Sequence, residues 1–317
     1  MTCSKTMPEQ GVDYPRNWNE FMDWFSEEEK CYEYLEKIRW KNGFICPSCN
    51  TKEEPYRTTR GRLTCKSCLH QTTVTAGTIF HRTRTPLRTW FSAIWYVTNQ
   101  KQGTNALGLQ RVLGFKCYQT AWAMLHKLRR AMIRPDRERL SGIVEVDESY
   151  LGGKETGVVG RWVEKKSIVA VAVELNEKGG LGRVRLRQIM DVTADSLIPF
   201  VCEMVEPGSI VKTDGWSGYS RLNEHGYIHD KTILSSSASP AHVSMPGVHQ
   251  VASLVKRWML GTHHGSFSPQ HLDYYLDEFT FRFNRRTSRS RGLLFYRLIE
   301  QAISHSPEPY YSLIGGL

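Results

Sequence analysis

Two cysteine pairs constrain the fold of this chain more than any other feature of its sequence. Cys46-x2-Cys49 and Cys65-x2-Cys68 are separated by fifteen residues, in the stretch CPSCNTKEEPYRTTRGRLTCKSC. Two such pairs at this separation are typical of a tetrahedral zinc site, in which each pair holds the metal from a tight turn. The residues between them alternate like the arm of a β-hairpin, as a zinc ribbon requires. Four unrelated thiols are the alternative. We predict one structural zinc ion, because four thiolates leave no open coordination position.

Charge and composition restrict the partner and the compartment. The 317 residues carry a formal net charge of +10, which favours an anionic partner, with nucleic acid the first candidate. No apolar run approaches the roughly 20 residues needed to cross a bilayer, and the first residues do not resemble a signal peptide. We therefore expect a cytoplasmic protein, in which cysteines bind metal or stay reduced rather than forming disulfides.

A helical region follows the cysteine pairs. Residues 104–132 predict a short helix, with Thr104 as its N-cap, a turn at Gly114-Phe115 and a second helix from about residue 118. This layout is that of a helix-turn-helix, whose second helix could enter a major groove. A helical bundle that only connects domains is the alternative. The basic side chains that we expect to contact DNA from the second helix are Lys127, Arg129 and Arg130.

The second half of the chain alternates strands and helices. Three strands, a helix, a fourth strand ending at Asp214 and further helices form the element order of a ribonuclease-H-like fold. In that fold the first and fourth strands are neighbours, so Asp147, near the end of the first strand, and Asp214 are expected to share a site. The predicted elements are strands at 142–153, 166–175 and 182–192, a helix at 196–205, a strand within 208–219 and a weaker strand in HDKTILSSS.

The sequence thus predicts an α+β multidomain protein: a zinc ribbon, a helix-turn-helix region and a ribonuclease-H-like catalytic domain with a mixed sheet. The expected boundaries are an N-terminal helical lead-in at 1–40, the ribbon at 41–80, the helix-turn-helix at 81–133, the catalytic domain at 142–300 and a tail at 301–317.

From about residue 20 to residue 300 the chain resembles bacterial insertion-sequence transposases of the DDE superfamily, in the ISXO-like group that has an N-terminal transposase zinc ribbon. The motifs that carry the resemblance are CPSC, CKSC, VDESYLGGKE, KTDGWSGY, VKRWMLGTHHG and LDEFTFRFNRR. The resemblance implies a metal-dependent enzyme that binds the inverted-repeat ends of an element, cuts DNA there and joins the freed 3′ ends to target DNA. It also implies a homodimer or larger synaptic complex that acts in the bacterial cytosol, at the nucleoid.

The chain departs from the superfamily pattern at one position. The resemblance implies a third acidic residue about 35 residues after Asp214, with a lysine seven residues later; His249 and Lys256 stand at these positions. His249 would then replace the usual glutamate. Asp147 would bridge two metal ions, Asp214 and His249 would each hold one, and Lys256 would contact a DNA phosphate. Helical periodicity places His249 and Lys256 on one face, two turns apart.

Three alternatives to this assignment stay open. His249 could be a surface residue, with Glu148 or another carboxylate as the third ligand. The site could have decayed, or Lys256 could be merely solvated. We expect Glu145 and Glu148 to point away from the strand face that Asp147 uses, toward solvent or in support of the ligands.

Phosphodiester cleavage and strand transfer require residues that bind divalent metals, which explains the two aspartates and the histidine. Two divalent metals about 4 Å apart can activate the attacking oxygen and stabilise the leaving oxygen. Carboxylate oxygens suit Mg²⁺, whereas a neutral imidazole suits softer ions, so His249 shifts the expected preference toward Mn²⁺.

Two further expectations concern DNA. Five arginines within ten residues, among them Arg285 and Arg286, indicate a contact with the DNA backbone or a solvated helix end. A DNA-binding protein without catalysis, either a regulator or a domesticated transposase remnant, is the alternative function. The two aspartates and the downstream histidine and lysine favour the enzyme.

Overall fold

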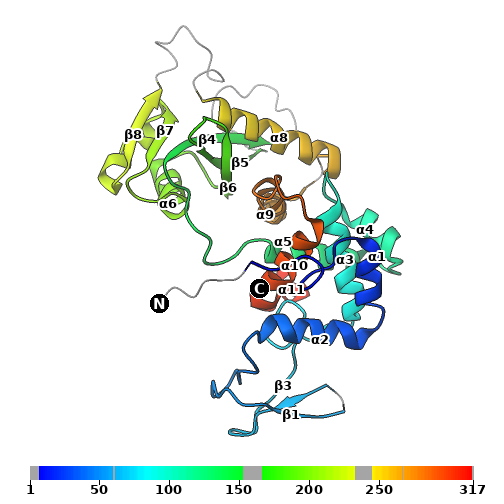
Figure 1. Ribbon diagram of the computed structural model, residues 1–317. Helices are drawn as coiled ribbons and strands as arrows, with labels where there is room; N and C mark the ends of the chain where they lie inside the picture. Colours follow the sequence, from blue (N-terminus) through cyan, green and yellow to red (C-terminus); the bar gives the residue numbers. More distant parts are fainter. Residues whose placement is uncertain (1–6, 60, 153–165, 233–244, 266, 316–317) are drawn as a thin grey trace. The chain divides into compact units, whose positions relative to one another are not determined.

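The computed structural model describes residues 7–59, 61–152, 166–232, 245–265 and 267–315, which form two compact units (Figure 1). One unit comprises Met1–Arg134 together with Ser288–Leu317, and the other comprises Pro135–Thr287. The expected catalytic boundary at residue 300 is therefore wrong, since the last long helix belongs to the N-terminal unit. No helix of the described residues is long and apolar enough to cross a membrane.

An aromatic cluster explains why the last long helix belongs to the N-terminal unit. Phe295 on the last long helix is fully buried, and its ring lies 5.5 Å from Phe21 and 5.7 Å from Phe91. Phe25 packs edge-on against Phe91 at 4.9 Å. The C-terminal segment thus completes a core that the N-terminal segment begins. The helices that meet there are α1 (Trp18–Trp24), α2 (Glu28–Arg39), α3 (Leu87–Asn99) and α10 (Arg291–Ser304).

The expected ribbon is a three-stranded antiparallel sheet of very short strands. β1 (Tyr56–Arg57) pairs with β2 (Leu63–Thr64), which pairs with β3 (Gln71–Thr72). Its buried cluster consists of Phe44, Leu63 and two of the cysteines, with Trp40 packed against it. Such a core is too small to stabilise a fold by burial alone.

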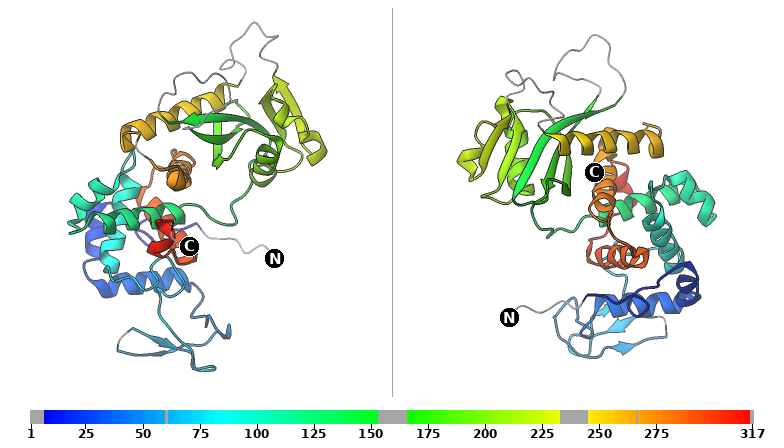
Figure 2. Two further views of the ribbon diagram at one scale, coloured as in Figure 1. Left: turned by 180° about the vertical axis from the view of Figure 1, so that it is seen from behind. Right: turned by 45° about the horizontal axis from the view of Figure 1, so that its top comes forward.

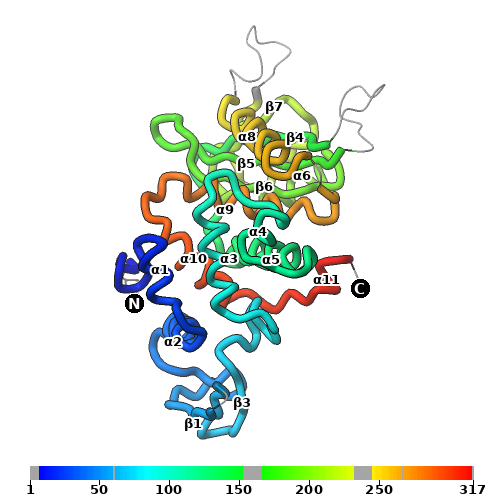
Figure 3. Tube along the Cα trace, turned by 90° about the vertical axis from the view of Figure 1, so that its right-hand side faces the viewer, coloured from blue at the N-terminus to red at the C-terminus, as the bar shows by residue number. Residues whose placement is uncertain are grey.

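The helix-turn-helix consists of α4 (Ala106–Leu113) and α5 (Tyr118–Ala131), which pack against each other (Figure 3). Asn105, rather than the expected Thr104, caps α4 by accepting a hydrogen bond from the Gly108 backbone N–H at 2.8 Å. Gly114 ends α4 with φ of 67°, a conformation that favours glycine. The short helix α11 (Tyr310–Leu313) follows α10 in the same unit.

The second unit is built on a five-stranded mixed sheet in the order β6-β5-β4-β7-β8. β4 pairs antiparallel with β5 and parallel with β7, so the first and fourth strands are neighbours, as expected. This order confirms the ribonuclease-H-like fold. The strands are β4 (Ile143–Leu151), β5 (Ser167–Leu175), β6 (Leu181–Ile189), β7 (Ile210–Asp214) and β8 (Ile228–Thr232).

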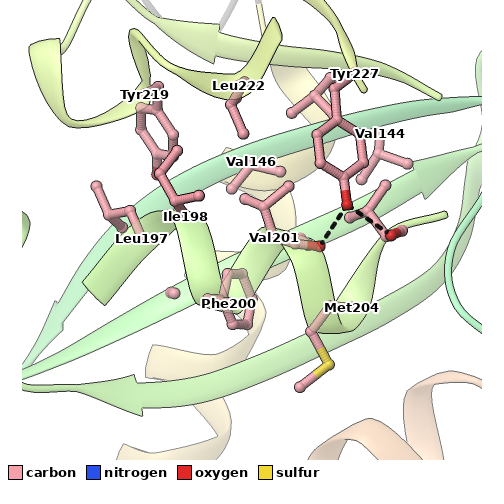
Figure 4. Close-up of a cluster of buried hydrophobic side chains, with 14 of the residues drawn as sticks. Val144, Val146, Leu197, Ile198, Phe200, Val201, Met204, Tyr219, Leu222 and Tyr227 are labelled. Atoms are coloured by element: carbon pink, nitrogen blue, oxygen red, sulfur yellow. Dashed lines mark hydrogen bonds between the residues drawn. The ribbon is translucent and has the colours of Figure 1, made fainter. Parts of the chain in front are cut away.

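Helices cover both faces of the sheet, and Figure 2 shows this unit from two further directions. On one face α6 (Ala194–Met204) packs on Val144 and Val146 (Figure 4). There the Tyr227 hydroxyl donates to the carbonyl of Val205 at 3.0 Å. On the other face, α8 (Pro246–His263) and α9 (Leu272–Phe283) pack on β5 and β6. Short 3-10 helices lie at Ser217–Tyr219, Leu222–His225 and Pro269–His271.

Candidate active site and zinc-binding site

The four cysteines of the ribbon form a potential zinc site. Their sulfur atoms all lie within 4.8 Å of one another, with 3.6 Å between Cys46 and Cys68 and between Cys49 and Cys65. A tetrahedron of thiolates around zinc, with Zn–S bonds of about 2.3 Å, has edges of about 3.8 Å. The donor set therefore fits zinc in both chemistry and spacing.

Two matching turns produce this arrangement. The backbone N–H of Cys46 donates to the carbonyl of Thr51, and that of Cys65 donates to the carbonyl of His70. Asn50 and Leu69, each four residues after the first cysteine of its pair, have φ of 58° and 61°. Each turn thus brings both thiols of its pair to the same side, and the local spacing of the sequence already specifies it.

The electrostatics of the thiols also suit a cation. Hydrogen bonds with Thr51 lower the pKa of Cys49 to about 6. The backbone hydrogen bond at His70 lowers the pKa of Cys68, but contact with the Cys49 sulfur outweighs it and raises that pKa to about 12. Thiolates this close together repel one another, and a bound cation would offset that repulsion.

Asp147 and Asp214 come together because β4 and β7 are parallel neighbours. Glu145 pairs with Lys212 in the β4–β7 register, and the same register continued for two residues along both strands would bring Asp147 level with Asp214, the last residue of β7. Strand alternation then directs both carboxylates to the face that α8 covers. Asp147 lies at the middle of β4 rather than near its end, and Asp214 is the last residue of β7.

His249 lies in the first turns of α8, next to Asp147. Its Nδ1 is 3.9 Å from Oδ2 of Asp147, too far for a hydrogen bond. Its Nε2 is buried and has no hydrogen-bond partner among the described residues. About 4.2 Å is the greatest separation that two metal–ligand bonds of about 2.1 Å can span, so one ion could contact both side chains.

Glu145 fixes the position of that helix. Its carboxylate is buried and accepts a hydrogen bond at 2.8 Å from the backbone N–H of Val248, in the first turn of α8. A Cβ at Gly247 would lie 2.9 Å from the same carboxylate, so the close approach requires glycine. The expectation that Glu145 points away from Asp147 is wrong. Residues two apart on a strand share a face, and this alternation was the signal in the sequence.

Glu148 lies on the opposite face of β4, as expected. Burial first, and then the charge of Glu148, raise the pKa of the fully buried Tyr219 hydroxyl well above its ordinary value. The charges of Asp147 and Asp214 raise it further. Trp216 is held by its indole N–H, which donates to the carbonyl of Val192 at 2.7 Å.

Asp147, Asp214 and His249 do not form as tight a cluster as the cysteines. Within the described residues, the only group of three or more potential ligands with all donor atoms within 4.8 Å is the cysteine group. A site for two metal ions about 4 Å apart does not require that each ligand atom approach every other. Two carboxylates and one imidazole, with the unsatisfied Nε2 of His249, have the donor chemistry for divalent cations.

Lys256 is exposed on α8, seven residues after His249. His263, at the end of the helix, is buried with its ring 4.7 Å from Trp258 and 4.6 Å from Tyr275. His263 therefore belongs to the core, whereas Lys256 and its neighbour Arg257 are exposed about two turns beyond His249.

The structure separates the three basic residues expected on the helix-turn-helix. Arg129 is buried, and its guanidinium donates to the carbonyl of Thr104 at 3.3 Å. Because this contact holds α5 to the segment before α4, the expectation that Arg129 contacts DNA is wrong. Arg130 is exposed, whereas Lys127 is half-buried.

Arg285 and Arg286 are also engaged within the protein. Each guanidinium lies 4.1 Å from the centre of a phenylalanine ring, of Phe281 and Phe283 respectively. Arg286 donates to the carbonyls of Leu181 and Gly182 on β6. The contacts of Arg286 anchor the end of α9 to the edge of the sheet. The expected contact of Arg285 and Arg286 with DNA stays a prediction.

Comparisons with known proteins agree with both sites. The family model described as ISXO2-like transposase domain matches residues 139–284, and the transposase zinc-ribbon domain matches residues 26–71. An uncharacterized protein in transposable element ISH50 of Halobacterium salinarum is 27% identical over 281 residues, covering 81% of this chain and 91% of that protein. An uncharacterized transposase-like protein of Haemophilus influenzae is 24% identical over 115 residues, covering 36% of this chain and 92% of that protein.

Among solved structures, the catalytic core domain of BIV integrase is similar, with a TM-score of 0.32 and 16% identity over 48% of this chain and 89% of that one. The fold assignment rests on the strand order and not on this likeness. A transposase zinc ribbon followed by an ISXO2-like transposase domain, together with a relative aligned along most of both chains, shows that the chain belongs to the ISXO2-like transposases with an N-terminal zinc ribbon.

Proposed function

We propose that this transposase binds the inverted-repeat ends of an insertion sequence, cleaves DNA there and joins the 3′ ends to target DNA. The observation that carries the proposal is that Nδ1 of His249 lies 3.9 Å from Oδ2 of Asp147 on β4, while β7, whose last residue is Asp214, runs parallel beside β4. Three potential ligands from β4, β7 and α8 thus converge on one face of the sheet.

Each side chain has a distinct role in this proposal. Asp147, between the other two, would hold both metal ions, while Asp214 and His249 would each complete one of them. The chemistry that a pair of Mg²⁺ or Mn²⁺ ions supplies, when bound, is activation of the attacking oxygen and stabilisation of the leaving oxygen. Lys256 would contact a DNA phosphate beside the scissile bond and so orient the strand. Glu145 would act indirectly, by holding the start of α8.

The N-terminal unit would supply end recognition. We propose one zinc ion in the ribbon, which holds it folded, and insertion of α5 into a major groove. Because an element has two ends, the working complex would contain at least two copies of the chain.

The decisive experiment measures strand transfer by purified full-length protein with the element's own ends, in Mg²⁺ and in Mn²⁺. Asp147→Ala, Asp214→Ala and His249→Ala should each abolish cleavage and joining while retaining end binding. Gln250→Ala is the matched control, because Gln250 is the exposed neighbour of His249 on the same helix and should keep parental activity.

His249→Glu tests the ligand role more sharply. Glutamate restores an oxygen ligand, so we expect measurable activity with a preference shifted toward Mg²⁺, although imperfect geometry could cost about 10²-fold. A His249→Ala protein as active as its parent would refute the role of His249. Full end binding without cleavage by the parent in either metal would favour the alternative, a DNA-binding regulator.

A further inference from the structure

The N-terminal unit contains a cleft that none of the roles above uses. It lies between the segment HRTRT, residues 81–85, and the first half of α5, and its volume is about 300 Å³. Its walls come from segments some 35 residues apart in the sequence, so the sequence alone does not reveal it. The side chains that matter below are Arg82, Arg84, Thr85, Gln119, Thr120 and Lys127.

The lining is cationic. Arg82, Arg84 and Lys127 carry three positive charges, and no aspartate or glutamate is among the lining residues. Arg82 and Arg84 are exposed, and in the described part of the chain neither guanidinium has an ion-pair partner. Thr85, Gln119 and Thr120 add neutral hydrogen-bonding groups. A site with several cations and hydrogen-bond donors but no acid suits a phosphate.

The segment that carries the arginines is held in place. The Thr83 hydroxyl accepts hydrogen bonds from the indole of Trp90 at 2.9 Å and from the backbone N–H of Thr85 at 3.1 Å. The backbone at Arg82 is in the left-handed region, with φ of 52°, so the chain makes a turn at this residue. The arginines therefore project from an ordered turn, which reduces the entropy lost when they bind a ligand.

The other wall is the part of α5 that a helix-turn-helix directs at DNA. In that motif the first residues of the second helix contact base edges. Tyr118, Gln119 and Thr120, at the start of α5, are all exposed, and the last two also line the cleft. Burial lowers the pKa of Lys127, while the Glu308 charge raises it, so this lysine sits deeper than the arginines.

We propose that this cleft binds a phosphate of the DNA backbone beside the major groove that α5 enters. The inference rests on the proposed DNA-binding function. Arg82 and Arg84 donate hydrogen bonds to the phosphate oxygens from the ordered turn, and Lys127 adds a third positive charge from within the cleft. Gln119 and Thr120, which line the cleft and also begin α5, lie between the bound DNA phosphate and the edges of the bases. The phosphate contact fixes the register of α5 on the duplex, and the residues at its start read the sequence.

The test is binding of full-length protein to the element ends over a range of salt concentrations. Each lost phosphate contact reduces the slope of log K against log salt by about 0.9. Arg82→Ala with Arg84→Ala should therefore reduce the slope by about 0.9, because both side chains contact the same phosphate, and should weaken binding to specific and unrelated duplexes alike. Gln119→Ala should instead reduce discrimination between those duplexes and leave the slope unchanged.

Matched controls separate this contact from net charge and from folding. Lys30→Ala with Lys37→Ala removes the same charge from exposed positions of α2, beside the acidic run Glu27–Glu29, and should leave the slope unchanged. Arg82→Lys with Arg84→Lys keeps the charges and should retain most of the parental slope. The inference would be overturned if the double alanine variant kept the parental slope of log K against log salt. It would also be overturned if the α2 control lost as much of that slope as the double alanine variant.

The experiment also distinguishes this inference from the proposed catalysis. Asp147→Ala should bind with the parental slope and fail to cleave. If the parent cleaves but the cleft variants bind normally, the cleft inference fails and the transposase proposal stands. If the slope falls as expected but the parent never cleaves, the cleft stands and the catalytic proposal fails.

Discussion

The zinc ribbon and the sheet unit obtain their stability from opposite sources. In the ribbon, strands of two residues surround a cluster in which two of the four buried residues are cysteines of the potential zinc site. In the sheet unit, apolar side chains are buried on both faces of a five-stranded sheet, against α6 on one side and α8 and α9 on the other. A short segment with ligands at fixed spacing needs little core, whereas a site assembled from three elements needs a large one.

Removing a ribbon ligand should produce the largest effect. Cys46→Ser should release zinc and unfold the ribbon, because structural zinc supplies about 10–16 kcal/mol in small zinc-binding peptides. Zinc content and amide exchange of the ribbon measure this, and exchange in the sheet unit should not change. Cys117→Ser, at an exposed cysteine outside the cluster, is the control and should retain zinc. Retention of zinc by the Cys46 variant would contradict the dependence of the ribbon on its four thiolates.

A core truncation should show the reverse pattern. Phe200 on α6 is 1% exposed and packs against the sheet, so Phe200→Ala should cost about 3–5 kcal/mol in the free energy of unfolding of that unit. Zinc content should remain at the parental value. Met190→Ala, at a side chain that is 90% exposed, should change stability by less than about 0.5 kcal/mol. If Phe200→Ala also released zinc, the two regions would not be independent.

Glu145 tests how the sheet core positions the site. Glu145→Ala leaves the backbone N–H of Val248 without its acceptor, which should cost about 1–3 kcal/mol and speed amide exchange in the first turn of α8. Cleavage should fall without a change in DNA affinity, because the helix that carries His249 loses its anchor. Glu145→Gln keeps an oxygen acceptor and should recover most of both properties; equal defects in the two variants would argue against the anchor.

The smallest effect is expected at an ion pair in the N-terminal unit. Glu300 accepts hydrogen bonds from Lys41 at 2.6 Å and from Arg297 at 2.7 Å. Burial raises the pKa of Glu300, but these hydrogen bonds outweigh burial and lower it below its ordinary value. A lowered carboxylate pKa stabilises the fold above the unfolded pKa, and this stabilisation disappears as pH falls through the folded pKa.

Glu300→Gln should therefore cost up to about 1 kcal/mol at pH 7, since the pair is only partly buried. The cost should disappear as pH falls through the lowered pKa of the folded state, below which the carboxyl is protonated in both states. Urea midpoints of parent and variant in the same buffer measure it. A difference that persists at low pH would assign the effect to packing.

Several features were predictable because their causes are local. The spacing of Cys46, Cys49, Cys65 and Cys68 predicted the ribbon, whose geometry is set within a few residues of each pair. Period-two and helical patterns predicted the strand order and the separation of His249 and Lys256 along one helix. The opposite orientation of Glu148 followed from the same alternation, and the error at Glu145 came from not applying that rule.

Other features depended on which segments meet in three dimensions. Arg129 and Arg286 resemble surface cations in the sequence, yet each donates to backbone carbonyls of another segment. A charge pattern in the sequence describes what a side chain can bind, but it does not say which group contacts that side chain in the folded protein. The cleft beside α5 was missed for the same reason, although two arginines alternating with threonines before Pro86 were a visible signal.

The sequence by itself determined the zinc ribbon, the ribonuclease-H-like order of elements and the candidate residues Asp147 and Asp214, because ligand spacing and residue periodicity act over short stretches of chain. The family resemblance added His249 as a candidate. Only the tertiary structure decided that β4 and β7 stand in register, that Glu145 anchors α8 beside Asp147, and that α10 completes the N-terminal core. Those outcomes depend on packing between segments far apart in the sequence, where burial and hydrogen bonding choose among partners that local patterns leave equivalent.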